Sequence, residues 1–106
     1  MKSGGSRGYL SETTRKVAMR SLLSLTEEAS DPNTYFNRVS IALGIPIREF
    51  HGEVAERDVP KLLEPYIDKC YVKVARIRHH TGGKEHIGYR ADLSRRQQIE
   101  EELIKP

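Results

Sequence analysis

The stretch from residue 71 to residue 90 constrains the fold of this chain more than any other part. It reads YVKVARIRHHTGGKEHIGYR, in which two runs rich in β-branched and aromatic residues flank a turn signal at Thr81-Gly82-Gly83. This pattern is typical of two antiparallel strands joined by a short loop. The hydrophobic period also changes from 3.6 to 2 at Tyr71. We therefore predict a β-hairpin with strands near residues 71–78 and 86–91.

The spacing of the turn suggests a register for the two strands. A five-residue loop over residues 80–84 would give the cross-strand pairs His79 with Glu85, Ile77 with Ile87, and Ala75 with Tyr89. Side chains alternate along a strand, so one face of the hairpin would then be apolar. The opposite face would carry the basic residues Arg76, Arg78, His86 and Arg90.

Positive charge is concentrated in this predicted hairpin. Residues 71–90 hold five Lys and Arg residues against one Glu, a net of +4, whereas the whole chain has a formal net charge of +3. A short basic projection of two strands is suited to contact phosphates. The alternative is a solvated edge hairpin that uses its charges to block aggregation. The hairpin alone does not choose between these two interpretations.

Length and composition predict a single domain with one modest core. The chain has 106 residues, of which 37% are hydrophobic and 31% charged. No apolar run approaches the roughly 18 residues that a bilayer-spanning helix needs, and no secretory signal opens the chain. The one cysteine, Cys70, cannot form an internal disulfide and fits the reducing cytoplasm, where we expect the protein to reside. We expect residues 1–10 to be a flexible arm and residues 11–106 to form the domain.

Two helices are predicted in the first half of the chain. Ser11 can cap a helix from about Glu12 to Thr26, with an apolar stripe that includes Ala18, Leu22 and Leu25. A second helix should run from about Pro32 to Leu43, after Asp31. Its inward residues would be Phe36, Val39 and Leu43, and Gly44 would end it in the left-handed conformation.

Residues 39–46, VSIALGIP, resemble the second helix and the turn of a helix-turn-helix. In that motif a small residue, here Ser40, lies four positions before the turn glycine, here Gly44. Residues 62–103 then resemble the order of a winged helix: a leucine pair, a corner, an apolar-basic strand, a glycine turn, an aromatic strand and a helix. Over residues 11–104 the chain thus resembles the winged helix-turn-helix superfamily. The resemblance implies an α+β fold in which helices precede a basic β-hairpin wing and a C-terminal helix.

In such a fold the helix from about residue 47 to residue 57 would be the recognition helix. Its outward basic residues are Arg48, His51 and Arg57. Residues 46–70, however, hold four basic and six acidic residues, and acidic groups repel phosphates. The 27 residues between Gly44 and Val72 also exceed what one helix needs. We therefore expect either a broken recognition helix or an extra helix after Asp58 that turns Leu62 and Tyr66 inward and is kinked or restarted at Pro65.

The last predicted helix runs from about Ser94 to Ile104. Ser94 and Gln97 have the spacing of a capping box. Arg95 and Arg96 in its first turn oppose the helix dipole, which favours a nearby anion or acidic partner. Its narrow stripe of Ile99, Leu103 and Ile104, together with the first helix, suggests the interface of a homodimer.

No residue pattern in the chain indicates catalysis, a metal or a cofactor. Cys70, His79, His80 and His86 match no zinc-ligand spacing, and Cys70 is expected to be a small buried hydrophobic residue. Gly82-Gly83 opens no helix and so forms no phosphate loop. We therefore predict that the protein is not an enzyme.

Two classes of function fit the predicted fold. In the first, the protein binds duplex DNA in a sequence-dependent manner, as a small transcriptional regulator or a plasmid- or phage-type factor. Helix 47–57 would then enter the major groove through Arg48, His51 and Arg57. The wing would contact mainly phosphates, through Arg76, Arg78, Lys84 and His86. In the second, the fold is a protein-binding adaptor or inhibitor whose interface is the acidic surface of residues 49–64.

Overall fold

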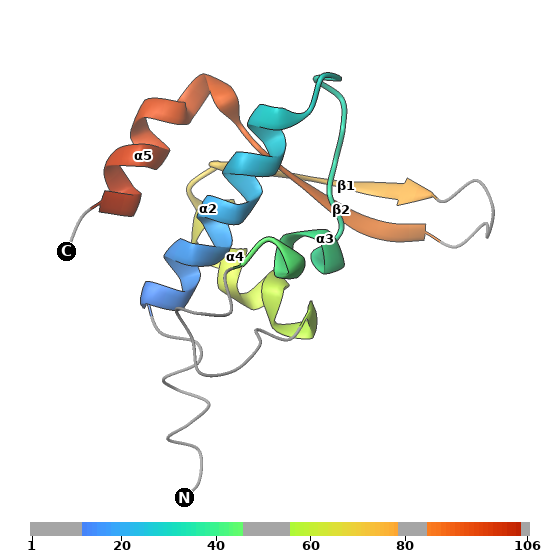
Figure 1. Cartoon of the computed structure of the whole chain (residues 1–106), viewed down its shortest axis with the longest axis horizontal. Helices are drawn as coiled ribbons and strands as arrows, with labels where there is room; N and C mark the ends of the chain where they lie inside the picture. Colours follow the sequence, from blue (N-terminus) through green and yellow to red (C-terminus); the bar gives the residue numbers. More distant parts are fainter. Residues whose placement is uncertain (1–11, 46–55, 79–84, 105–106) are drawn as a thin grey trace, which may run out of the picture.

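The computed structural model describes residues 12–45, 56–78 and 85–104. These form an α+β arrangement (Figure 1), with the elements α2 (Glu12–Glu28), α3 (Arg38–Leu43), the 3-10 turn η2 (Glu56–Asp58), α4 (Val59–Asp68), β1 (Val72–Arg78), β2 (Glu85–Ala91), the 3-10 turn η3 (Leu93–Arg95) and α5 (Arg96–Ile104). The α+β class is as predicted. The element order is compatible with a winged helix-turn-helix, although it is not specific to that fold. The predicted arm, residues 1–10, lies outside the described residues.

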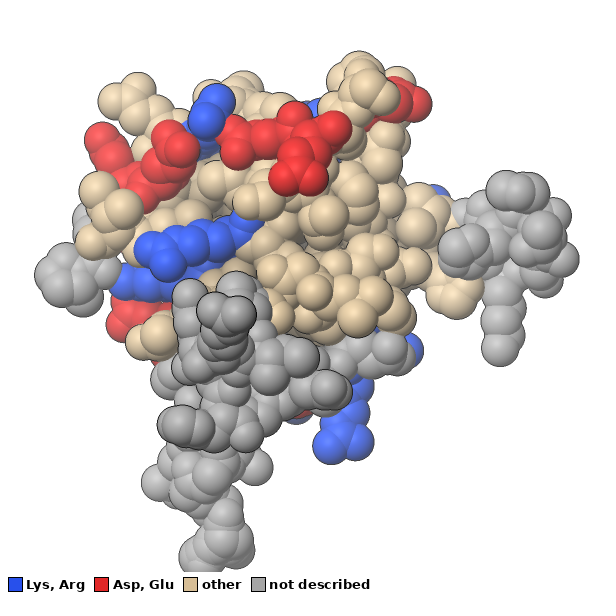
Figure 2. Space-filling model, viewed as in Figure 1, with Lys and Arg blue, Asp and Glu red and all other residues tan. Residues whose placement is uncertain are grey.

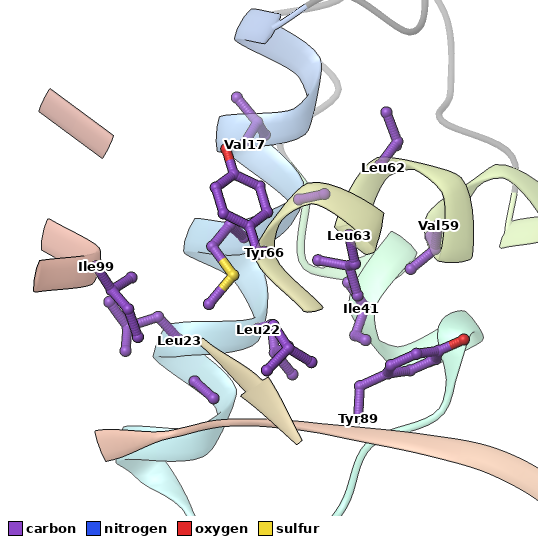
Figure 3. Packing of buried hydrophobic residues seen from close by; sticks show 14 of the residues in the cluster. Val17, Leu22, Leu23, Ile41, Val59, Leu62, Leu63, Tyr66, Tyr89 and Ile99 are labelled. Atoms are coloured by element: carbon purple, nitrogen blue, oxygen red, sulfur yellow. The ribbon is translucent and has the colours of Figure 1, made fainter. Parts of the chain in front are cut away.

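The hydrophobic core is centred on α2. Ala18, Met19 and Leu22 of this helix are fully buried, as the predicted stripe requires. Figure 3 shows side chains from α3, α4 and β2 converging on the same region, and Ile99 of α5 approaching α2 beside Leu23. Burial of this apolar surface is the dominant favourable term in folding. One core therefore contains residues of α2, α3, α4, β1, β2 and α5.

The end of α2 is fixed to the end of the hairpin by one buried hydroxyl. Thr26 donates from Oγ1 to the carbonyl of Leu22 at 2.8 Å and accepts from the backbone N–H of Ala91 at 3.1 Å. A buried polar group without a hydrogen-bond partner destabilises the folded state, so both bonds of the Thr26 hydroxyl contribute to stability. The helix continues two residues past the predicted Thr26, to Glu28.

The second predicted helix begins six residues later than expected. Asp31 Oδ1 accepts from the N–H of Asn33 at 2.8 Å and forms a turn instead of a helix start. The N-cap is Asn37, whose side chain accepts from the N–H of Ser40. Between the two, Phe36 exchanges two backbone hydrogen bonds of 2.8 Å with Tyr89. The backbone pairing with β2 thus determines the conformation of this segment, although the local sequence favours a helix.

This shift also changes which residues α3 buries. The predicted burial of Val39 and Leu43 is wrong, because Val39 is 40% and Leu43 81% exposed. Ile41 is the buried residue of α3, on the opposite side of the helix. A six-residue helix has room for one inward position, and Ile41 occupies it.

Gly44 ends α3 for a different reason than predicted. Its φ is −80°, in the right-handed region, so no left-handed conformation calls for glycine. A Cβ at this position would instead lie 2.3 Å from Ser21 Oγ, which donates to the carbonyl of Ile41 at 2.8 Å. Glycine allows α3 to approach α2 closely.

The strands β1 and β2 match the predicted hairpin, but the register differs by one residue. The observed pairs include Val74 with Tyr89, Ala75 with Gly88, Arg76 with Ile87, and Ile77 with His86. The predicted pairs Ile77 with Ile87 and Ala75 with Tyr89 are therefore wrong. A slip of one residue moves side chains to the other face of a strand. The observed register places Val72, Tyr89 and Ala91 together in the core.

The helix before the hairpin, α4, runs without interruption through Pro65, where we predicted a kink or a restart. It closes through two backbone bonds, from the N–H of Cys70 to the carbonyl of Ile67 at 3.0 Å and from Tyr71 to Tyr66 at 2.8 Å. This is a Schellman closure, in which the residue after the cap is left-handed. Cys70 occupies that position with φ 65° and is exposed, contrary to its predicted burial.

The C-terminal helix α5 begins at Arg96, after the 3-10 turn η3. The predicted capping box at Ser94 is wrong, since Asp92 Oδ1 accepts from both the N–H and the hydroxyl of Ser94, at 3.1 and 2.7 Å. The bond from the Ser94 hydroxyl holds the pKa of the Asp92 carboxyl below its usual value. Arg96 finds its acidic partner within the chain, with Nε 2.7 Å from Glu27 Oε2.

Candidate nucleic-acid interface

The hairpin extends away from the helical body, and the end of β1 and the start of β2 lie at the opposite end of the molecule from α5 (Figure 1). Its base, which we define as Val72, Tyr89 and Ala91, is buried. Its outer half is not: Ile87 is 46% exposed, and the side chain of Arg76 opposite it is 77% exposed. The exposed side chains of this projecting element are therefore available to a partner.

One face of the hairpin, which we call the core-side face, carries Arg76 along with the residues of the base. The register places Arg76 opposite Ile87, on the same side as Tyr89. The Arg76 side chain is 77% exposed, and its Nη1 lies 3.9 Å from Glu85 Oε1. An exposed pair at that distance contributes little to stability. The guanidinium of Arg76 can thus reorient toward an anion at small cost.

The other face, which we call the outer face, carries Lys73, His86 and Arg90. Lys73 and His86 are exposed, and Arg90 donates from Nη1 to the carbonyl of Thr34 at 3.1 Å. We predicted that Arg76, Arg78, His86 and Arg90 share one face. This is wrong, since Arg76 lies on the core-side face and His86 and Arg90 lie on the outer face. Arg78 ends β1 opposite Glu85. The hairpin presents positive charge on both of its faces.

The predicted helix contacts are placed only in part. Arg48, His51 and the wing residue Lys84 lie outside the described residues. Arg57 is exposed and belongs to the 3-10 turn η2. The helix that leads into the hairpin is α4, whose exposed side chains are of mixed charge, as in Lys61 and Glu64. Of the described elements, β1 is the most basic, with Lys73, Arg76 and Arg78 and no acidic residue.

Sequence reasoning left three basic residues out of the site: Arg38, Lys73 and Arg90. Arg38 is the first residue of α3 and is exposed. The helix α3 contacts β2. Burial raises the pKa of the Tyr89 hydroxyl, and the positive charge of Arg38 acts in the opposite direction. Asn37 is a good N-cap residue, and this signal could have placed Arg38 at a helix start beside the hairpin.

The charges at the other end of the molecule are arranged differently. Figure 2 shows Asp and Glu side chains along the top of the displayed face, over α5 and the C-terminal part of α2. The basic groups there are matched by acidic ones at close range. Arg96 pairs with Glu27 at 2.7 Å, and Lys69 pairs with Glu102. The hairpin, with its 3.9 Å pair, is the better candidate for an external anion.

The predicted dimer stripe on α5 is largely used within the chain. Ile99 is fully buried and Leu103 is 5% exposed, so only Ile104, at 76%, remains open to a partner. A homodimer stays a prediction. No group of three or more potential metal-ligating residues occurs among residues 12–45, 56–78 and 85–104. No helix in these ranges is both long and apolar enough to cross a bilayer.

Comparison of the chain with protein-family models, with curated proteins and with solved structures finds no match in any of the three.

Proposed function

We propose that the protein binds duplex DNA and that the projecting hairpin is its main phosphate-contacting element. The observation that carries the proposal is the exposure of basic side chains on both faces of the hairpin, Arg76 on one and Lys73 on the other. Phosphate contacts supply most of the sequence-independent affinity of DNA-binding proteins. The winged helix-turn-helix resemblance adds a role for this hairpin as the wing.

A hairpin with cations on both faces suits a groove, where phosphates lie on two sides. Neighbouring strands are about 4.8 Å apart, and a two-stranded ribbon fits the major groove of about 12 Å. Arg38 and Arg57, exposed on α3 and η2, would add contacts from the helical body. We assign the reading of base sequence to the predicted helix 47–57, through Arg48 and His51, which lie outside the described residues. Arg48→Ala should accordingly relax the preference for particular bases.

The test is a mobility shift on random duplex DNA across a salt series. Replacing Arg76, Arg78 and Lys84 with alanine should weaken binding to all sequences about equally. It should also flatten the slope of log affinity against log salt by about 0.9 per lost phosphate contact. The matched control removes three positive charges from the opposite end of the molecule, Lys69, Arg95 and Arg96, and should leave the slope close to that of the wild type.

Two results would contradict the proposal. A triple hairpin variant that is folded by circular dichroism and keeps the wild-type affinity and salt slope would remove the hairpin from the mechanism. A wild type that ignores duplex DNA even at low salt would remove DNA altogether. Sedimentation with and without DNA tests the further proposal that two copies read two half-sites about one helical turn apart.

A protein-binding adaptor or inhibitor is the second candidate, because Val39 and Leu43 of α3 are exposed. Large aliphatic side chains that lie one turn apart on a helix and face solvent often mark a binding surface. They belong to a helix that contacts η2, where the predicted acidic interface of residues 49–64 enters the described structure. Replacing both with serine should abolish partner binding in this case and leave DNA binding unchanged.

A further inference from the structure

At the end of the molecule away from the tips of β1 and β2, α2 and α5 lie side by side (Figure 1). Residues of both helices line a groove. Its volume is about 540 Å³. The α2 wall contains Leu23 and Glu27, and the α5 wall contains Glu100, Glu101 and Ile104. No part of the candidate DNA interface contributes to it. The groove is therefore a separate surface that a second partner can reach while the hairpin is occupied.

The floor of the groove is apolar. Leu23 and Leu103 lie there at 6% and 5% exposure, and Ile104 stands at the edge with 76% of its surface open. Arg20 donates from Nη2 to the carbonyl of Leu103 at 3.0 Å, which holds the last turn of α5 against α2. An aliphatic side chain of a partner can therefore pack between the exposed Ile104 and the apolar floor of the groove.

The rim of the groove is acidic. Three glutamates and one arginine line it, a net of −2. Arg96 lies beyond the lining and is 2.7 Å from Glu27 and 3.5 Å from Glu100, so it neutralises part of this charge. Glu101 is exposed, and no ion pair to it is found within the described part of the chain. The rim thus favours a cation next to the apolar floor.

We propose that this groove binds a short segment of a partner protein that carries lysine or arginine beside leucine or isoleucine. Charge complementarity selects this occupant over a second copy of the chain, so a homodimer would need a surface other than the predicted one on α5 and α2. Two copies that meet through the groove would bring their glutamates together, and like charges at an interface are costly. The proposal does not depend on DNA binding.

The experiment uses two synthetic peptides with the same leucine pattern, one flanked by lysines and one by glutamates, and the full chain. Fluorescence anisotropy should show that the wild type binds the lysine peptide about tenfold more tightly or better. A tenfold ratio corresponds to about 1.4 kcal/mol of binding free energy. The variant Glu100→Lys/Glu101→Lys should reverse the preference. The control Glu64→Lys/Asp68→Lys makes the same change of charge on α4, outside the groove, and should keep it.

A further variant separates the apolar part of the site from its charge. Ile104→Ser should weaken binding of the lysine peptide without unfolding the protein, because the side chain is already 76% exposed. Three results would overturn the proposal: no binding of either peptide, binding that the folded Glu100→Lys/Glu101→Lys variant leaves unchanged, or a dimer in sedimentation that Ile104→Glu converts to monomer. The last would assign the groove to a second copy.

Discussion

The two halves of the hairpin share the same strands but lie in different environments. In the base, Tyr89 is 5% exposed and Ala91 is fully buried. In the outer half, Ile87 is 46% exposed, although it lies on the same face only two residues before Tyr89. Backbone pairing continues through both halves. The difference therefore comes from what packs against each half and not from the strands themselves.

This difference separates the role of the hairpin in stability from its role in binding. The base is held by the core, by the bridge from Phe36 to Tyr89 and by the bond from Ala91 to Thr26. In the outer half the side chains of Arg76 and Ile87 are exposed, so a basic residue can lie there without a cost in folding. Substitutions in the base should change stability, whereas substitutions in the outer half should change affinity.

The largest expected effect is that of Tyr89→Ala. Removal of a large buried aromatic side chain costs about 3–5 kcal/mol, because the cavity cannot close fully. The matched change Ile87→Ala should cost about 1 kcal/mol or less, since half of that side chain is already in water. Urea unfolding of both variants measures the two values. Equal losses would show that the outer half is as well packed as the base.

Alkaline unfolding tests the core on which the base packs. Burial, supported by the charges of Glu102 and Glu12, raises the pKa of Tyr66 from 10.0 to about 12. The unfolded chain loses this proton near pH 10, so the stabilising contribution is complete below pH 10 and disappears as the pH rises to about 12. At 1.36 kcal/mol per pKa unit the loss is about 2–3 kcal/mol.

The variant Tyr66→Phe isolates this contribution. It cannot titrate, so its stability should fall less than that of the wild type between pH 10 and pH 12. Urea unfolding at pH 9, 10.5 and 12 gives the comparison. Parallel curves for the two proteins would mean that Tyr66 titrates normally and is not enclosed by the folded core.

The strands and the first helix could be predicted from sequence because their signals are local. The alternation of β-branched residues gave β1 and β2 to within one residue, and the stripe on α2 gave the core helix. The register could not be predicted in the same way. It depends on Tyr89 entering the core and on Phe36 pairing with it, and these residues are 53 positions apart in the chain.

The errors at helix starts have a similar physical cause. Asp31-Pro32 and Ser94 both carry good capping signals, yet Asn37 and Asp92 are the residues that accept from the first backbone N–H groups. Several residues in each segment can cap, and tertiary contacts select among them. For the candidate site, the exposure of Arg76 could be predicted from its place in the hairpin sequence. The division of the basic residues between the two faces could not be predicted, because it depends on the strand register.

Glycine substitutions compare close packing in the hairpin with close packing in the helical body. A Cβ on Gly88 would lie 2.8 Å from Tyr35 Cβ and 3.1 Å from the nearest Ile77 methyl carbon. Overpacking of this kind costs about 1–3 kcal/mol. Truncation of Tyr35 to alanine keeps its Cβ and should not rescue Gly88→Ala. Gly44→Ala conflicts with Ser21 Oγ, and Ser21→Ala should rescue it because the Cβ of residue 21 is 3.5 Å away.

Thermal unfolding of the four variants, two single and two double, tests this comparison. Rescue at both positions would mean that the segment at Tyr35 can move away from β2. The base of the hairpin would then be less rigid than the bridge between Phe36 and Tyr89 indicates.

The smallest expected effect concerns Cys70, the corner through which α4 enters the base of the hairpin. Its φ of 65° costs a non-glycine residue about 1–2 kcal/mol. Glycine avoids this strain but loses about 0.5–1 kcal/mol more conformational entropy on folding, so Cys70→Gly should stabilise the protein by about 0.5–1 kcal/mol. The side chain is exposed, so no packing is lost.

Cys70→Ala is the matched control, because it removes the thiol but keeps the Cβ and the strain. Its stability in urea should stay close to that of the wild type, while Cys70→Gly gains. If both variants lose stability instead, the thiol itself holds the corner, and the base of the hairpin depends on a contact of Cys70 as well as on its backbone. If only the glycine variant gains stability, the cost lies in the left-handed backbone of residue 70. The two backbone bonds that close α4 then hold the corner before β1 without the thiol.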